Sequence, residues 1–171
     1  MIKKRNLIAF QRELFKLKDG GTISIDWVDE LPNERSMRPI MAIVPGLTSD
    51  NDEVYVTNLL LKAKRMGFRG LVINYRGASN TPLSSHTLYC AGSVEDIRQP
   101  LEYIYQKYGK GASIFVVGNS MGANIVANYV GEEGPNCFLK AAVCVQAPMK
   151  MWECGTHVQD KHYGFYNYVL G

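Results

Sequence analysis

Alternating and continuous apolar stretches divide the chain into short regular elements. Two stretches near the start alternate apolar with polar residues, as half-buried strands do, and Asp19-Gly20-Gly21 between them predicts a β-hairpin turn. The later stretches are short and continuously apolar, which is typical of strands buried on both faces of a parallel sheet. The strands predicted in this way cover residues 12–18, 22–28, 39–44, 68–75, 112–117 and 139–145.

Apolar residues at helical spacing separate most of these strands. The predicted helices cover residues 52–66, a segment that begins at Ser93, and residues 121–131. Ser93 followed by Asp96 predicts a capping box at the start of the second helix. Pro100 is expected to kink or shorten that helix, because proline has no N–H group to donate. The alternation predicts an α/β fold with a mostly parallel sheet and helices on both faces, preceded by the antiparallel hairpin.

Composition narrows the class of protein. The chain has 171 residues, of which 46% are hydrophobic and 20% charged, as expected for one globular domain. Its net charge of +3 is small and does not indicate a nucleic-acid partner. Basic residues are concentrated in the first 18 positions. We interpret this run as a solvated terminal strand, with weak attraction to anionic lipid as the alternative.

No segment indicates membrane insertion or secretion. No apolar run approaches the ~18 residues of a membrane span, and residues 7–10 are too few for the apolar core of a signal peptide. The four cysteines form no C-x-x-C pair and no zinc-like cluster, and Cys144 is interpreted as a core residue because its neighbours are apolar. We therefore expect a cytoplasmic protein or one peripheral to a membrane.

The candidate chemistry lies at Gly118-Asn119-Ser120-Met121-Gly122. The pattern Gly-x-Ser-x-Gly is weak alone, but here an apolar strand precedes it and a helix follows, which is the context of a nucleophile elbow. Such a turn presents the serine hydroxyl above the carboxyl end of the sheet, and the helix N-terminus favours developing negative charge. We predict that Ser120 is a nucleophile; the alternative is a serine that only caps the helix.

A second segment, Pro45-Gly46-Leu47-Thr48, follows the predicted strand 39–44. In folds with this elbow, one oxyanion-hole N–H comes from the loop after the third strand and the other from the residue after the nucleophile. We therefore predict that the backbone N–H groups of Leu47 and Met121 form an oxyanion hole. An ordinary Pro-Gly turn is the alternative.

Further short motifs follow one another along the chain. They are Asp19-Gly20-Gly21 with Asp26-Trp27, Asn74-Tyr75-Arg76-Gly77, Tyr89-Cys90-Ala91-Gly92 with Glu95-Asp96, Gly118 to Asn124, Tyr129 to Gly134, Ala141-Ala142-Val143 and Tyr166-Asn167. With the Pro-Gly-Leu-Thr segment, they resemble the N-terminal portion of the α/β-hydrolase superfamily's AB hydrolase 4 family, which includes YheT-like hydrolases and α/β-hydrolase-domain esterases and phospholipases. Ser49 departs from the family, which usually has glycine there.

The resemblance implies an α/β-hydrolase fold, with residues 1–171 as a partial domain that lacks the C-terminal strands and helices. It also implies hydrolysis of carboxylic esters or acyl lipids by a Ser-Asp-His triad, without a metal or organic cofactor. The expected partner is a small-molecule ester or lipid; no nucleic acid is expected, and membrane contact would be peripheral. The resemblance does not indicate an oligomeric state.

The sequence offers no clear general base for Ser120. In this fold the acid and the histidine follow the serine, each after a later strand, and only one more strand is predicted here. His86 precedes the elbow, and no predicted strand presents His157, Asp160 or His162. We assign none of the four to the triad.

Three interpretations of this gap stay open. The chain is the N-terminal part of a longer hydrolase, a catalytically inactive hydrolase that acts by binding, or a chain completed by another polypeptide. We favour the first, because the strand 139–145 would otherwise expose an apolar edge and make the chain poorly soluble. A doubly wound module that binds phosphate at residues 118–122 is an alternative from another class, but no nucleotide-binding glycine motif is present there.

Overall fold

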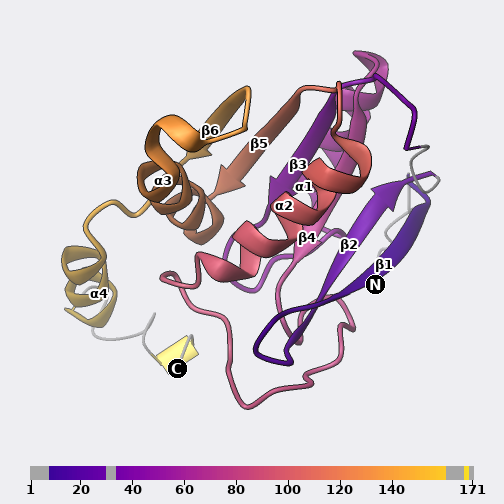
Figure 1. Ribbon diagram of the computed structural model, residues 1–171. Coiled ribbons are helices and arrows are strands. Elements are labelled where there is room, and N and C mark those ends of the chain that lie inside the picture. Colours follow the sequence, from indigo (N-terminus) through magenta and orange to yellow (C-terminus); the bar gives the residue numbers. More distant parts are fainter. Residues whose placement is uncertain (1–7, 30–33, 161–167, 170–171) are drawn as a thin grey trace.

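The computed structural model describes residues 8–29, 34–160 and 168–169. Its strands are β1 (Phe10–Lys16), β2 (Thr22–Val28), β3 (Ile40–Val44), β4 (Arg69–Asn74), β5 (Ile114–Asn119) and β6 (Ala141–Val145). They form one mixed sheet in the order β1-β2-β4-β3-β5-β6 (Figure 1). β2 runs antiparallel to β1 and β4, whereas the neighbours among β4, β3, β5 and β6 are parallel. The predicted α/β architecture with an N-terminal antiparallel hairpin is confirmed.

Helices cover both faces of this sheet. The described helices are α1 (Val54–Arg65), α2 (Glu95–Tyr108), α3 (Met121–Glu133), the short 3-10 helix η1 (Gly134–Asn136) and α4 (Met151–Asp160), and α4 lies apart from the sheet (Figure 1). Apolar side chains of α2 and α3 pack on one face, in a cluster that includes Ile25, Ile97 and Ile125. Side chains of α1 pack on the other face, in a cluster that includes Leu60 and Val72. Since β3, β4, β5 and β6 are parallel, the loops that follow them meet at one edge of the sheet, which we call the carboxyl edge.

The hairpin follows its prediction with one shift. β2 has the predicted bounds, but β1 ends at Lys16 rather than at residue 18. The turn takes up the difference, because the N–H of Leu17 donates to the carbonyl of Gly21 at 2.8 Å. Gly20 has φ +84°, a left-handed conformation that glycine adopts without a steric penalty.

The predicted capping box at α2 is wrong. Val94 is the N-cap residue of the helix and makes no side-chain cap. The Ser93 hydroxyl instead accepts the N–H of Cys90 at 3.0 Å, and the carboxylate of Asp96 pairs with Arg76. The Asp96 carboxylate, which the local pattern assigned to the cap, is therefore part of a long-range ion pair instead. Of the two effects expected of Pro100, a kink or a shortening, the shortening is wrong, since the helix continues past this buried proline to Tyr108, and the kink stays a prediction.

The last predicted strand forms, but the prediction that it is buried is wrong. β6 pairs with β5, and among the described residues it is an edge strand. All of its residues except Ala142 are exposed, and the side chain of Val143 is 52% exposed. Cys144 is likewise exposed rather than part of the core. The apolar sequence of this strand is not matched by apolar neighbours in the part of the chain that the structure describes.

Candidate active site

Ser120 forms the sharp turn between β5 and α3. Its backbone has φ 52° and ψ −116°, a conformation that costs an L-residue about 1–3 kcal/mol. Two hydrogen bonds hold the turn: the N–H of Ser120 donates to the carbonyl of Val145 at 2.8 Å, and its carbonyl accepts the N–H of Asn124 at 3.1 Å. Strained backbone of this kind persists only where neighbours enforce it, and it is concentrated at functional sites.

The glycines on either side of Ser120 are required by close backbone contacts. A Cβ atom at Gly118 would lie 2.6 Å from the carbonyl oxygen of Gly122. A Cβ atom at Gly122 would lie 2.3 Å from the carbonyl oxygen of Val44, at the end of β3. The start of α3 therefore packs directly against the segment that leads into Pro45-Gly46-Leu47-Thr48.

Two tyrosines hold this second segment in place. Tyr75 donates its hydroxyl to the carbonyl of Pro45 at 2.7 Å, and the N–H of Gly46 donates to the hydroxyl of Tyr55 at 3.0 Å. Burial raises the pKa of Tyr75 well above its ordinary value, so its phenol remains a donor. The N–H of Gly46 is therefore not available to a bound substrate. The next N–H group of the segment belongs to Leu47, and it donates to no acceptor among the described residues.

A cavity of about 340 Å³ lies between the two segments, and Leu47 and Ser120 both line it. Its remaining lining residues are Gly46, Ser49, Tyr55, Asn119 and Gln146. The approach is close, since a Cβ atom on Gly46 would lie 3.4 Å from Cβ of Ser120. Met121 directly follows Ser120 and has a buried side chain, and its N–H has no partner within the described part of the chain. The structure thus brings the three predicted site residues to one end of the sheet.

Among the described residues, no base lies within hydrogen-bond reach of Ser120. His86 and His157 are both exposed, and neither hydrogen-bonds to Ser120 within the described ranges. Asp160 ends α4, and His162 lies outside the described residues. Ser120 itself is exposed at the mouth of the cavity.

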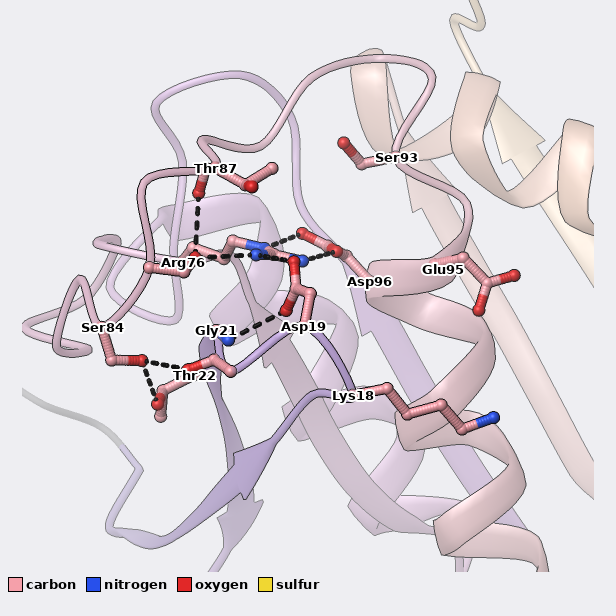
Figure 2. Close-up of polar contacts among 12 residues, drawn as sticks. Lys18, Asp19, Gly21, Thr22, Arg76, Ser84, Thr87, Ser93, Glu95 and Asp96 are labelled. Atoms are coloured by element: carbon pink, nitrogen blue, oxygen red, sulfur yellow. Dashed lines mark hydrogen bonds and ion pairs between the residues drawn. The ribbon is translucent and has the colours of Figure 1, made fainter.

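Arg76 connects three segments around the candidate site, and no role was predicted for it from the sequence. It follows β4, is 5% exposed, and donates twice to Asp96 on α2, at 2.7 and 2.6 Å (Figure 2). A third bond of 2.6 Å joins it to Asp19 in the hairpin turn. The hydrogen bond to Asp96 raises the pKa of Arg76 above its ordinary value, so the guanidinium stays charged. These contacts anchor the long loop that begins at Arg76 to the hairpin and to α2.

A second buried network lies around Asp26 on β2. Its fully buried carboxylate accepts two bonds of 2.7 Å from Arg12 and one of 2.8 Å from Asn74. It also accepts a bond of 2.7 Å from Asn51, which precedes α1. The other end of the Asn51 side chain accepts the hydroxyl of Ser79 at 2.9 Å. This network fixes the segment between Leu47 and α1 against both the sheet and the loop after β4.

Sequence reasoning missed these supporting residues for an identifiable reason. Asp26 is a charged residue inside a predicted strand, and Arg76 directly follows one, so both were visible as charges in apolar surroundings. Their partners Asn51 and Asp96 come from distant parts of the chain, and no local pattern specifies such pairs. The roles of Tyr55 and Tyr75 depend on the same long-range packing.

Two further properties of the described residues bear on the chemistry. Within residues 8–29, 34–160 and 168–169, no group of three His, Cys, Asp or Glu side chains could hold a metal ion. Over the same ranges, none of the helices combines the length and apolar character that crossing a bilayer requires.

Comparisons with known proteins identify relatives of this chain. The chain is 30% identical over 174 residues to phospholipase ABHD3 of Bos taurus, a match that covers 99% of this chain and 42% of that protein. It is 30% identical over 144 residues to the putative esterase YheT of Escherichia coli K12, which covers 84% of this chain and again 42% of the relative. The chain thus spans about two fifths of the length of these relatives.

Solved structures support the same fold. The Pyrococcus furiosus esterase Pf2001 superposes with a TM-score of 0.74 at 18% identity, over 95% of this chain and 61% of that one. A model of the alpha/beta hydrolase fold family matches residues 39–162. The resemblance inferred from the motifs is confirmed, and the chain belongs to the α/β-hydrolase fold family, with esterase and phospholipase relatives.

Proposed function

We propose that this chain carries the nucleophile and the oxyanion hole of a serine hydrolase that cleaves carboxylic esters or acyl lipids. The observation that carries the proposal is the strained backbone of Ser120, beside a cavity that Leu47 also lines. The esterase and phospholipase names of the relatives support ester or lipid as the substrate class.

In the proposed reaction, Oγ of Ser120 attacks the ester carbonyl and its proton passes to a histidine base. The N–H groups of Leu47 and Met121 stabilise the negative oxygen of the tetrahedral intermediate. Collapse of the intermediate expels the alcohol, which takes a proton from the histidine, and leaves an acyl group on Ser120. Water then attacks the acyl group and gives a proton to the histidine. The acid is released as Ser120 takes the proton back from the histidine.

The base and its carboxylate partner are proposed to lie outside the described residues. A serine hydroxyl needs a base within hydrogen-bond reach, and neither His86 nor His157 hydrogen-bonds to Ser120. The relatives are about twice as long as this chain or longer, so a longer protein with later strands could supply both groups.

The test is to express the natural gene product in its own host, as wild type and as Ser120→Ala. Both proteins are assayed on p-nitrophenyl butyrate and on dispersed phosphatidylcholine. We expect the variant to lose at least about 10³-fold in kcat, because removal of a triad nucleophile leaves only the residual effect of binding and the oxyanion hole. Retention of activity in the variant would overturn the assignment of Ser120.

A second candidate is a catalytically inactive protein that binds esters or a partner through the same cavity. It is favoured by one observation, the exposed hydroxyl of Ser120 without a base among the described residues. Absence of turnover in both proteins, together with equal binding of a non-hydrolysable ether analogue, would favour this candidate.

A further inference from the structure

The hydroxyl of Tyr55, on α1, has a proton that the described fold does not use. This hydroxyl accepts the N–H of Gly46 at 3.0 Å, and Tyr55 lines the cavity that also holds Ser120. A tyrosine hydroxyl can accept a hydrogen bond and donate another at the same time. Among the described residues, the O–H group of Tyr55 donates to no acceptor. Its proton is therefore available to a molecule in the cavity.

Tyr75 holds the same segment in a different way. Its hydroxyl donates to the carbonyl of Pro45 at 2.7 Å, so its proton is already in use. Its side chain is 1% exposed, and it is not among the residues that line the Ser120 cavity. Anchoring the segment thus accounts for the whole hydrogen bond of Tyr75, but it leaves the donor of Tyr55 unexplained.

The Tyr55 hydroxyl lies beside the predicted oxyanion hole. Leu47, whose N–H is one of the two predicted donors, directly follows Gly46, and consecutive Cα atoms are about 3.8 Å apart. A hydroxyl that bonds to the N–H of Gly46 is therefore about one residue away from the N–H of Leu47. Gly46 also approaches the nucleophile, since a Cβ atom on it would lie 3.4 Å from Cβ of Ser120.

The ring of Tyr55 is held by apolar contacts. Tyr55 is in the first turn of α1 and packs against the cluster that includes Leu60 and Val72. It also lines a neighbouring apolar cavity of about 620 Å³, to which Leu59 and Val143 contribute. With the ring packed here and the hydroxyl bonded to Gly46, the position of the donor is fixed before a substrate binds. A donor fixed in this way needs no reorganisation during the reaction.

The composition of the Ser120 cavity favours neutral donors. Of the described residues that line it, none is charged, so no cationic side chain is present there to stabilise negative charge. Ser49 also carries a hydroxyl, but this donates to the carbonyl of Leu47 at 3.4 Å. Tyrosine hydroxyls and backbone N–H groups both serve as oxyanion-hole donors in enzymes.

We propose that the Tyr55 hydroxyl donates a third hydrogen bond to the oxyanion, beside the N–H groups of Leu47 and Met121. This inference rests on the proposed hydrolase function and adds a catalytic residue to it. Tyr55 keeps its proton throughout; the hydrogen bond strengthens as negative charge develops on the carbonyl oxygen. A contact that is stronger in the transition state than with the neutral ester raises kcat and leaves KM nearly unchanged.

Tyr55→Phe tests the proposal, because it removes the hydroxyl and keeps the ring. Wild type and variant, each made as the natural gene product in its own host, are assayed on p-nitrophenyl butyrate and on its thionoester, in which C=S replaces C=O. Sulfur is a weak hydrogen-bond acceptor, so the thionoester depends less on oxyanion donors. We expect kcat on the oxygen ester to fall at least about tenfold, with KM within about threefold of wild type. The ratio of ester to thionoester rates should fall by a similar factor.

Tyr75→Phe is the matched control, because it removes the other anchor of the same segment and no group that lines the cavity. We expect its ratio of ester to thionoester rates to stay within about twofold of wild type. Thionoester turnover that Tyr55→Phe retains shows that this variant is folded and that Ser120 and its base still act. Urea unfolding compares the stability of the two variants.

Three results would overturn the proposal: an unchanged kcat in Tyr55→Phe, equal losses on the ester and the thionoester, or the same fall in the ratio in Tyr75→Phe. The last two would show that Tyr55 only anchors the segment. Ser120→Ala should lose turnover of both substrates. An inactive Ser120→Ala beside an unaffected Tyr55→Phe refutes the role of Tyr55 alone, whereas an active Ser120→Ala overturns the proposed function and this inference together.

Discussion

The two edge strands of the described sheet, β1 and β6, differ in whether they are protected against pairing with another chain. Two charged residues of β1 are paired: Arg12 bonds to the buried Asp26, and Glu13 accepts a bond of 2.9 Å from Lys107 on α2. β6 has the sequence Ala-Ala-Val-Cys-Val without a charged residue, and Val143 is half exposed. Charged edge strands resist pairing with other chains, whereas flat apolar ones invite it. β1 is therefore protected against pairing with another chain, whereas β6 presents an apolar edge suited to pairing with a further strand.

The open side of β6 lies close to the candidate site, because the N–H of Ser120 donates to the carbonyl of Val145 at the end of this strand. The turn at Ser120 depends on Gly118, Gly122, Val44 and Val145, all of which belong to the described strands and the turns that adjoin them. The turn at Ser120 is thus held entirely by these elements, although β6 has one open side among the described residues. A base would have to approach from beyond that side or from the loops above it, where the described residues supply none.

The largest effect on stability is expected at the β1 end. Asp26→Ala leaves the buried donors of Asn51 and Asn74 and the charge of Arg12 without their acceptor. We expect the free energy of unfolding to fall by about 3–5 kcal/mol, measured by urea denaturation. Val143→Ala at the β6 end is the matched change and should cost less than about 0.5 kcal/mol. Equal losses at the two ends would remove the contrast between them.

The second-largest effect on stability is expected at the strained turn of Ser120, between β5 and α3. Ser120→Gly should raise the free energy of unfolding by about 1–2 kcal/mol, because glycine adopts positive φ without the steric cost that serine bears. Ser120→Ala retains Cβ and should show no such gain. If the two variants are equally stable in urea, the backbone of Ser120 is not strained.

A smaller effect depends on pH and concerns Glu13. Burial raises the pKa of Glu13, but hydrogen bonds from Tyr103 and Lys107 outweigh it, so the pKa lies below its ordinary value of 4.5. A lowered pKa stabilises the fold above the unfolded-state pKa, and this contribution is lost as the pH falls through the folded-state pKa. Glu13→Gln should cost roughly 1 kcal/mol at neutral pH. The difference from wild type should shrink in acid, and a constant difference would contradict the assignment.

The smallest change in folding free energy is expected for a charge on β6, although its effect on association is large. Val143→Lys should change the free energy of unfolding by less than about 0.5 kcal/mol. Sedimentation velocity should show that it reduces self-association of the 1–171 chain, because a lysine on an edge strand opposes pairing. Leu14→Lys, on the exposed side of β1, should leave the association state unchanged. If Val143→Lys and Leu14→Lys change self-association equally, the contrast between β6 and β1 is wrong.

Much of the fold was predictable because its determinants are local. The alternation in residues 22–28 set the bounds of β2, and Asp19-Gly20-Gly21 set the hairpin. The sharp turn at Ser120 was predictable because Gly-x-Ser-x-Gly stands between an apolar strand and a helix, and the role of Ser120 as a nucleophile stays a prediction. What escaped prediction depends on contacts between distant segments. Asp96 pairs with the distant Arg76 and does not take part in the predicted capping box. Residues 139–145 were predicted to be buried, but the described residues supply no neighbour that covers β6.

The most direct test of the central claim is to label the natural gene product in lysate of its own host with a fluorophosphonate probe. This probe reacts with serine hydroxyls activated by a base, and the modified serine is located by mass spectrometry in the tryptic peptide of residues 111–140. We predict modification of Ser120 and its loss in Ser120→Ala. Absence of labelling at Ser120, while other serine hydrolases in the same lysate react, would contradict the claim that Ser120 is a nucleophile.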